Sequence, residues 1–240
     1  MNHEEHLRFG VDYGTGTVIV AAQWIRQNLS IHDSPIDYLQ LRPHQEAEIE
    51  QTAVWAGHSD VDDEVVYGRM DVAQWRQKNP KNEDRLIELA KLGLHQDFQG
   101  SPAVVRLYKV LGSRQGDLGS LQEFITYHLR CIRSDAIKAY RKIFTDAHAT
   151  EIPDFESLPS QWYIAVPSLA TERANGVMLS AARDAGMGRV NLVEEPLCAA
   201  VTAITLVHEK GRLRVCCSIR FLEYMLINWS RRATGLRSLT

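Results

Sequence analysis

The stretch RFGVDYGTGTVIVAA, residues 8–22, decides the fold of this chain. Residues 8–12 and 17–22 are rich in the β-branched and small apolar side chains that are typical of strands. The tetrapeptide between them carries Gly14 and Gly16, and glycine tolerates the backbone angles of a tight turn. The stretch therefore predicts a β-hairpin made of the first two strands of the protein.

Short apolar runs after the hairpin predict three further strands, at residues 36–41, 53–56 and 65–67. The pattern then becomes helical. Residues 82–93 have one apolar side and Asn82 can cap their first turn, so this segment predicts a helix that ends at Gly93. Ser120 and Glu123 form a capping-box pattern at the start of a long amphipathic helix that continues to Phe144.

Strands and helices alternate in the last third of the chain, after a proline-containing linker at residues 152–160. Residues 162–166 predict a strand, and Thr171 can cap a helix whose end is marked by Gly186. Residues 190–193 predict another strand, and Pro196 opens a further helix. This alternation predicts an α/β sheet.

Charge divides the chain into two parts. Residues 1–205 carry 20 basic and 28 acidic side chains, a net charge of −8, whereas residues 206–240 carry 7 and 2, a net charge of +5. The acidic main part gives no reason to expect nucleic acid as a partner. Four cysteines without a CxxC pair, no leader-like start and no apolar run of about 20 residues predict a cytoplasmic protein without a membrane span.

The glycines of the hairpin also suggest a chemical role. A dinucleotide-binding glycine pattern must open a helix, whereas the residues after Gly16 read as a strand. A glycine hairpin can still direct backbone N–H groups at a phosphate, and Asp12 just before the turn suits a magnesium ion held through water. The alternative is a plain turn with a solvated aspartate. Neither a Gly-x-Ser-x-Gly elbow nor a metal-binding histidine pair is present in the sequence.

The stretch FGVDYGTGTVIVAA, residues 9–22, resembles the first phosphate loop of the actin/Hsp70/sugar-kinase ATPases. Residues 162–204 are similar to the Hsp70 stretch in which a VPA-type turn, a helix ending in AG, a short strand and an EP-AAA helix follow one another. Weaker similarities lie at residues 51–56, 66–68 and 90–93. The chain thus resembles the divergent Hsp70-like proteins of filamentous fungi from residue 8 to residue 206.

The resemblance implies a bound ATP and magnesium ion at the hairpin. Gly14, Thr15 and Gly16 would hold the β- and γ-phosphates, and Asp12 would contact the magnesium ion through its water shell. Positioning and charge neutralisation of this kind are what phosphoryl transfer requires.

Three more residues receive roles from the resemblance. Lys91 would contact the γ-phosphate and the attacking water, and Glu195 would help to organise that water and the metal, although Glu194 is an equally placed match. Pro167 would couple the nucleotide state to lobe movement. Arg173 lies near, but not at, the position of the arginine that partners this proline in Hsp70.

The resemblance also implies the architecture. Residues 1–206 would form lobe I of an actin-like, ribonuclease H-like ATPase, an α/β lobe with a mixed sheet, flanking helices and a helical insertion at about 69–150. Residues 207–240 would be an unrelated basic tail outside the fold. The glycine-rich motif that begins the second lobe is absent from the sequence, which predicts a C-terminally truncated product.

The missing lobe limits the expected activity. ATP is gripped between two lobes in this family, so we expect ATP binding to be weak or lost and hydrolysis to be impaired. An uncovered lobe face predicts contacts with other proteins, instability or self-association. The alternatives are a non-catalytic interaction fragment or gene relic, and a sugar-kinase lobe, for which no sugar pocket can be located in the sequence.

Overall fold

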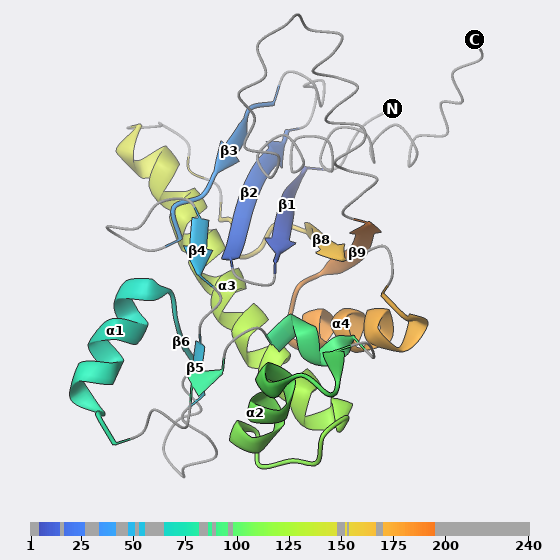
Figure 1. Ribbon diagram of the computed structural model, residues 1–240. Helices are drawn as coiled ribbons and strands as arrows, with labels where there is room; N and C mark the ends of the chain where they lie inside the picture. Colours follow the sequence, from blue (N-terminus) through green and yellow to red (C-terminus); the bar gives the residue numbers. More distant parts are fainter. Residues whose placement is uncertain are drawn as a thin grey trace, which may run out of the picture.

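A computed structural model of the chain (Figure 1) describes residues 5–14, 17–26, 34–41, 48–50, 53–55, 65–81, 86–87, 90–95, 98–147, 152, 154–166 and 170–194. The predicted helix after Pro196 and the predicted tail at residues 207–240 lie outside these residues. The predicted division of the chain at residue 206 therefore stays a prediction.

A mixed sheet forms the centre of the molecule. Its strands follow the order β3-β2-β1-β8-β9, and β4 also pairs with β2. The predicted hairpin is confirmed, since β1 and β2 pair antiparallel, whereas β8 and β9 extend the sheet in parallel from the other edge of β1. The bounds are β1 (His6–Tyr13), β2 (Thr17–Ile25), β3 (Ile36–Tyr38), β4 (Glu48–Glu50), β8 (Ser160–Val166) and β9 (Arg189–Glu194).

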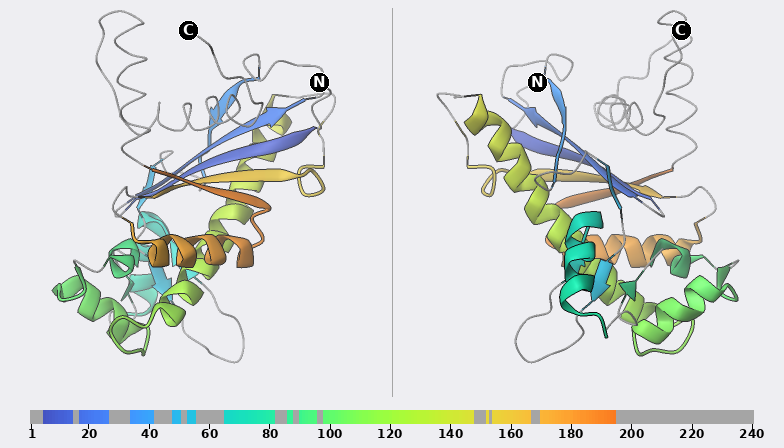
Figure 2. Two further views of the ribbon diagram at one scale, coloured as in Figure 1. Left: turned by 90° about the vertical axis from the view of Figure 1, so that its right-hand side faces the viewer. Right: turned by 60° about the vertical axis from the view of Figure 1, so that its left-hand side comes forward.

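Two helices cover one face of this sheet, as Figure 2 shows: α3 (Leu118–Asp146) and α4 (Glu172–Asp184). The predicted cap of α4 is confirmed, because the Thr171 hydroxyl accepts the N–H of Ala174 at 3.1 Å. Gly186, with φ of 77°, lies in the left-handed region just after the helix, as the sequence predicts. The chain is therefore an α/β protein.

The predicted start of α3 is wrong by one turn. The helix is capped by Asp117 rather than Ser120, since the Asp117 carboxylate accepts the N–H of Gly119 at 3.1 Å. The Ser120 hydroxyl donates to the same carboxylate at 3.0 Å. Both residue types are good caps, and the earlier aspartate adds a negative charge at the positive end of the helix.

A second, three-stranded sheet lies beside the first, in the order β6-β5-β7. The helix predicted at residues 82–93 is wrong, because Leu86 and Ile87 form strand β7 on β5, and a 3-10 helix, η3, covers only part of the rest. Within the predicted insertion at 69–150, the described residues form several helices and the strand β7. The elements of this part of the molecule are β5 (Ala53–Trp55), β6 (Val65–Tyr67), α1 (Arg69–Lys78), β7 (Leu86–Ile87), η3 (Ala90–Leu94) and α2 (Pro102–Val110).

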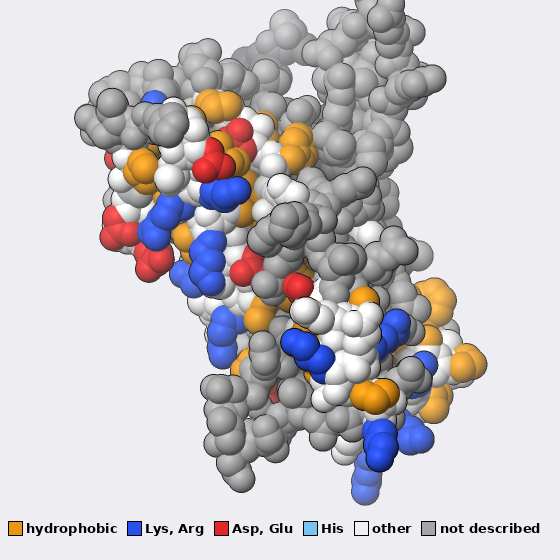
Figure 3. Space-filling model, turned by 90° about the vertical axis from the view of Figure 1, so that its left-hand side faces the viewer, with side chains coloured by type: hydrophobic (Ala, Val, Ile, Leu, Met, Phe, Trp, Pro, Cys, Tyr) orange, Lys and Arg blue, Asp and Glu red, His pale blue; other side chains and the backbone are white. Residues whose placement is uncertain are grey.

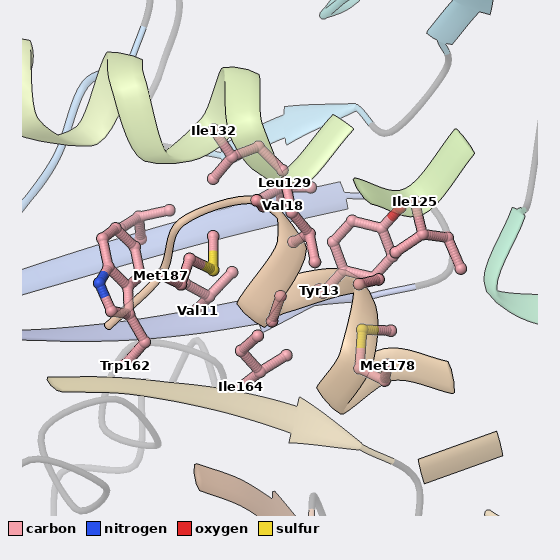
Figure 4. Close-up of a cluster of buried hydrophobic side chains, with 14 of the residues drawn as sticks. Val11, Tyr13, Val18, Ile125, Leu129, Ile132, Trp162, Ile164, Met178 and Met187 are labelled. Carbon is pink, nitrogen blue, oxygen red and sulfur yellow. The ribbon is translucent and has the colours of Figure 1, made fainter. Parts of the chain in front are cut away.

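The core lies between the helix-covered face of the central sheet and α3 and α4. Alternate residues of each strand point into it, because side chains alternate across a strand. Figure 4 shows Val11, Tyr13 and Val18 of the hairpin beside Ile125 and other residues of α3. This packing fixes the hairpin, and with it the turn between β1 and β2, on α3.

Candidate functional site

The turn between β1 and β2 brings Asp12 and Gly14 together at one end of the hairpin. The N–H of Gly14 donates to the carbonyl oxygen of Thr17 at 3.0 Å. A Cβ added to Gly14 would lie 3.0 Å from that oxygen and 3.8 Å from both Oδ1 of Asp12 and Oγ1 of Thr17. The close approach explains the glycine at this position. Thr15 and Gly16 lie outside the described residues.

The ends of three parallel strands lie side by side near this turn. Val11 of β1 pairs with Ile164 of β8, and the same register continued by two residues places Tyr13 opposite Val166. Val166 in turn pairs with Glu194 at the end of β9. With strands about 4.8 Å apart, the end of β9 lies about 10 Å from the end of β1. Ligands of open α/β sheets bind at the carboxyl ends of parallel strands. The turn therefore lies at the edge of the sheet where a ligand is expected.

The two predicted carboxylates of this edge can be assigned to faces of the sheet. Asp12 is half-buried and, by the alternation of β1, lies on the face opposite to Tyr13, in one row with Ala165. Glu194 pairs with Val166, a core residue of the helix-covered face, so Asp12 and Glu194 lie on opposite faces. The positions predicted to act at the ends of β8 and β9, Pro167 and Glu195, lie outside the described residues.

Lys91 lies on the helix-covered side of the sheet. It belongs to η3, which packs against α2 and α3, and only 2% of its surface is exposed. Asp12, by contrast, faces the other side. The structure thus brings Asp12 and Gly14 together and places Lys91 in the packing of the helices.

Arg173, in the first turn of α4, lines a cavity of about 340 Å³. Thr171, Gln99 and Gly116 line the same cavity. Pro167, to which the resemblance assigns the coupling to lobe movement, is outside the described residues.

A buried pair that the sequence analysis did not single out lies under the turn. The hydroxyl of Tyr13 is 3.0 Å from Nδ1 of His128 on α3, and both side chains are buried. Burial lowers the pKa of His128 to about 3 and raises the pKa of Tyr13. The signal was present, since His128 lies at helical spacing between Phe124 and Ile132, two residues of the predicted apolar stripe.

Within the described residues, no cluster of three or more His, Cys, Asp or Glu side chains is arranged to hold a metal ion. Asp12 alone would leave most coordination positions of a cation to other ligands. On the face drawn in Figure 3, lysine and arginine lie among acidic side chains in the upper part, and further basic side chains gather at the lower right. No helix within the described ranges has both the length and the apolar character of a membrane span.

Neither a protein-family model nor a curated protein matches the chain.

Proposed function

We propose that the chain is a Mg-ATP-binding lobe of the Hsp70-like, actin-type class, with the β1–β2 turn as its phosphate site. The observation that carries the proposal is the position of the turn. A glycine turn with a preceding aspartate lies at the carboxyl end of β1, beside the ends of two parallel strands. The sequence resemblance at residues 9–22 points to the same turn.

The order of the central sheet supports the same class. An antiparallel run of three strands, β1, β2 and β3, is continued by parallel β8 and β9 on the free edge of β1. This arrangement suits a ribonuclease H-like lobe. The long connection from β3 to β8, which holds the small sheet and α3, corresponds to the insertion that the resemblance implies.

The residues present fit a magnesium nucleotide. Asp12 supplies a hard carboxylate oxygen, the Thr17 hydroxyl lies close to Gly14, and the glycine leaves the backbone of the turn open to an anion. Magnesium usually keeps several waters and takes further oxygens from substrate phosphates, so a single protein carboxylate is sufficient. When bound, the ion would neutralise the phosphate charge that develops during transfer.

The remaining residues are assigned from their faces. Because Glu194 and Asp12 lie on opposite faces, we assign the water-orienting role to Glu195 rather than to Glu194. Pro167 keeps the role that the resemblance implies, as part of this proposal. Lys91 is given no contact with the γ-phosphate here, because it is buried among the helices on the side of the sheet opposite to Asp12. With one lobe enclosing only part of the nucleotide, we expect weak affinity and slow hydrolysis.

Calorimetric titration of Mg-ATP into the folded chain tests the proposal. We expect binding that is lost when EDTA removes magnesium and is weakened at least about tenfold in Asp12→Asn, which removes one charge near the phosphates. The matched control is Asp37→Asn in β3, a half-buried aspartate that pairs with the far end of β2. Both variants should keep the circular dichroism spectrum of the parent.

Two results would contradict the proposal. One is the absence of binding heat from a chain shown to be folded. The other is equal affinity in Asp12→Asn and Asp37→Asn, which would place the nucleotide elsewhere.

A further inference from the structure

Tyr13 stands between the two functional residues of the turn and points the other way. Asp12 and Gly14 flank it in sequence, while its side chain enters the core toward α3 (Figure 4). There its hydroxyl lies 3.0 Å from Nδ1 of His128, a residue 115 positions away. The conformation of the turn is therefore linked to a side chain in the middle of α3.

The link is strong because, within the described part of the chain, His128 has no other polar partner. Only 1% of its surface is exposed, and its Nε2 atom makes no hydrogen bond to a described residue. A buried polar group that loses its only partner retains the full cost of its desolvation. Movement of Tyr13 away from His128 is therefore disfavoured.

His128 also contacts the small sheet. Its ring lies 5.0 Å from the ring of Tyr67, at 60° between planes. Tyr67 ends strand β6, and its hydroxyl donates a hydrogen bond to the carboxylate of Asp135, about two turns beyond His128 along α3. Three parts of the molecule, the turn, α3 and the small sheet, thus meet at one imidazole.

We propose that Tyr13 and His128 are positioning residues, which hold the phosphate-binding turn in register with α3 and the small sheet. The proposal rests on the proposed function for the turn's ligand, a nucleoside triphosphate with magnesium. The hydrogen bond between Tyr13 and His128 would act on the ligand through the backbone. Tyr13 is the residue before Gly14, whose N–H closes the turn by donating to the carbonyl oxygen of Thr17. A displacement of β6 would therefore also shift the turn, through the contacts of Tyr67 with His128 and of His128 with Tyr13.

The test compares two buried tyrosines on the full chain. Tyr13→Phe removes the hydroxyl and keeps the ring. Tyr140→Phe makes the same change at a buried tyrosine of α3 that packs on Phe9 and Phe155, away from the turn. His128→Leu removes the ring nitrogens, and His128→Gln restores a polar group for Tyr13.

The first readout needs no nucleotide. Hydrogen exchange of the Gly14 amide should be about tenfold faster in Tyr13→Phe than in the parent, the effect of one lost hydrogen bond confined to this region. Tyr140→Phe should leave this amide unchanged. His128→Leu should behave as Tyr13→Phe, and His128→Gln should recover part of the protection. If His128→Leu does not fold, Tyr13→Phe and His128→Gln carry the comparison.

The second readout is Mg-ATP affinity. We expect Tyr13→Phe to raise Kd about five- to tenfold and Tyr140→Phe to leave it unchanged. Equal exchange of Gly14 in the two tyrosine variants overturns the proposal, and so does faster exchange with an unchanged Kd. If the parent chain binds no Mg-ATP while Gly14 exchange still follows Tyr13 and His128, the proposed function fails and the link between turn and helix stands.

Discussion

The two faces of the central sheet differ in the side chains that they carry. On the helix-covered face, Phe9 of β1 stacks on Trp162 of β8, with ring centroids 4.2 Å apart and planes at 13°. On the opposite face, Gly10 pairs with Ala21 and the buried Arg8 pairs with Gln23, while a smaller apolar cluster holds Ile19, Tyr163 and Ala165. The helix-covered face carries the larger apolar core, and the other face carries a smaller apolar cluster together with polar and charged side chains.

Core residues and candidate site residues are therefore neighbours in the sequence of β1, on opposite faces of the sheet. Tyr13 packs into the core, and Asp12, one residue before it, faces the other way. Because side chains alternate with a period of two, a slip of one residue would exchange the two sets completely. The register of β1 is therefore fixed by packing on one face, and Asp12 is oriented by it without contributing to the core.

The largest effect is expected from Phe9→Ala on the helix-covered face. Deletion of a fully buried aromatic ring should lower the free energy of unfolding by about 3–5 kcal/mol, measured by urea denaturation. Phe98→Ala is the control, since Phe98 is 46% exposed and should cost less than about 1 kcal/mol. A cost at Phe9 as small as that at Phe98 would show that this face does not hold the fold.

A medium effect on the free energy of unfolding is expected from a change of pH, through His128 on the same face. Burial lowers the pKa of His128 to about 3, below the value of about 6.5 in the unfolded chain. The unfolded state then binds the proton first, so stability is complete above pH 6.5 and falls as the pH falls toward 3. Between pH 7 and pH 5 the parent should lose about 2 kcal/mol more than His128→Gln. Parallel pH profiles of the two chains would contradict this prediction.

The smallest effect is expected from Arg8→Met on the opposite face. Arg8 is only 6% exposed, donates from Nε to His6 at 3.1 Å, and has its pKa lowered by burial. Replacement of a buried cation by an apolar side chain of similar length is often neutral or stabilising, so we expect a change within about 1 kcal/mol. A loss comparable to that of Phe9→Ala would remove the contrast between the faces.

Regular periodicity allowed the central sheet and its long helices to be predicted from the sequence. Apolar residues recur at every second position in the hairpin and in the strand before α4, and at spacings of three and four in α3 and α4. The small sheet was only partly predicted. Leu86 and Ile87 form a strand of two residues, too short for any period, and only pairing with β5 decides their conformation. Helix α1 begins at Arg69 after Gly68, which offers no side-chain cap, so the sequence gave no start signal for it.

The candidate site was predictable where its signal is local. Asp12 and Gly14 are neighbours in sequence, and the glycine turn marks them directly. The role of His128 was not predictable, because its hydrogen bond to Tyr13 joins residues 115 positions apart. The alternation of β1 and β9 was needed as well, since only pairing shows that Glu194 and Asp12 lie on opposite faces.

Strand β1 pairs on one edge with β2, which follows it directly in the sequence, and on the other edge with the much later β8. This order has a consequence during synthesis of the chain. β2 follows at once, whereas the other edge of β1 waits for β8, about 150 residues later in the chain. At 5 to 20 residues per second, a ribosome needs roughly 10 to 30 s to supply that strand. For this interval the nascent hairpin exposes an unpaired edge, which is the surface on which two chains can pair with each other.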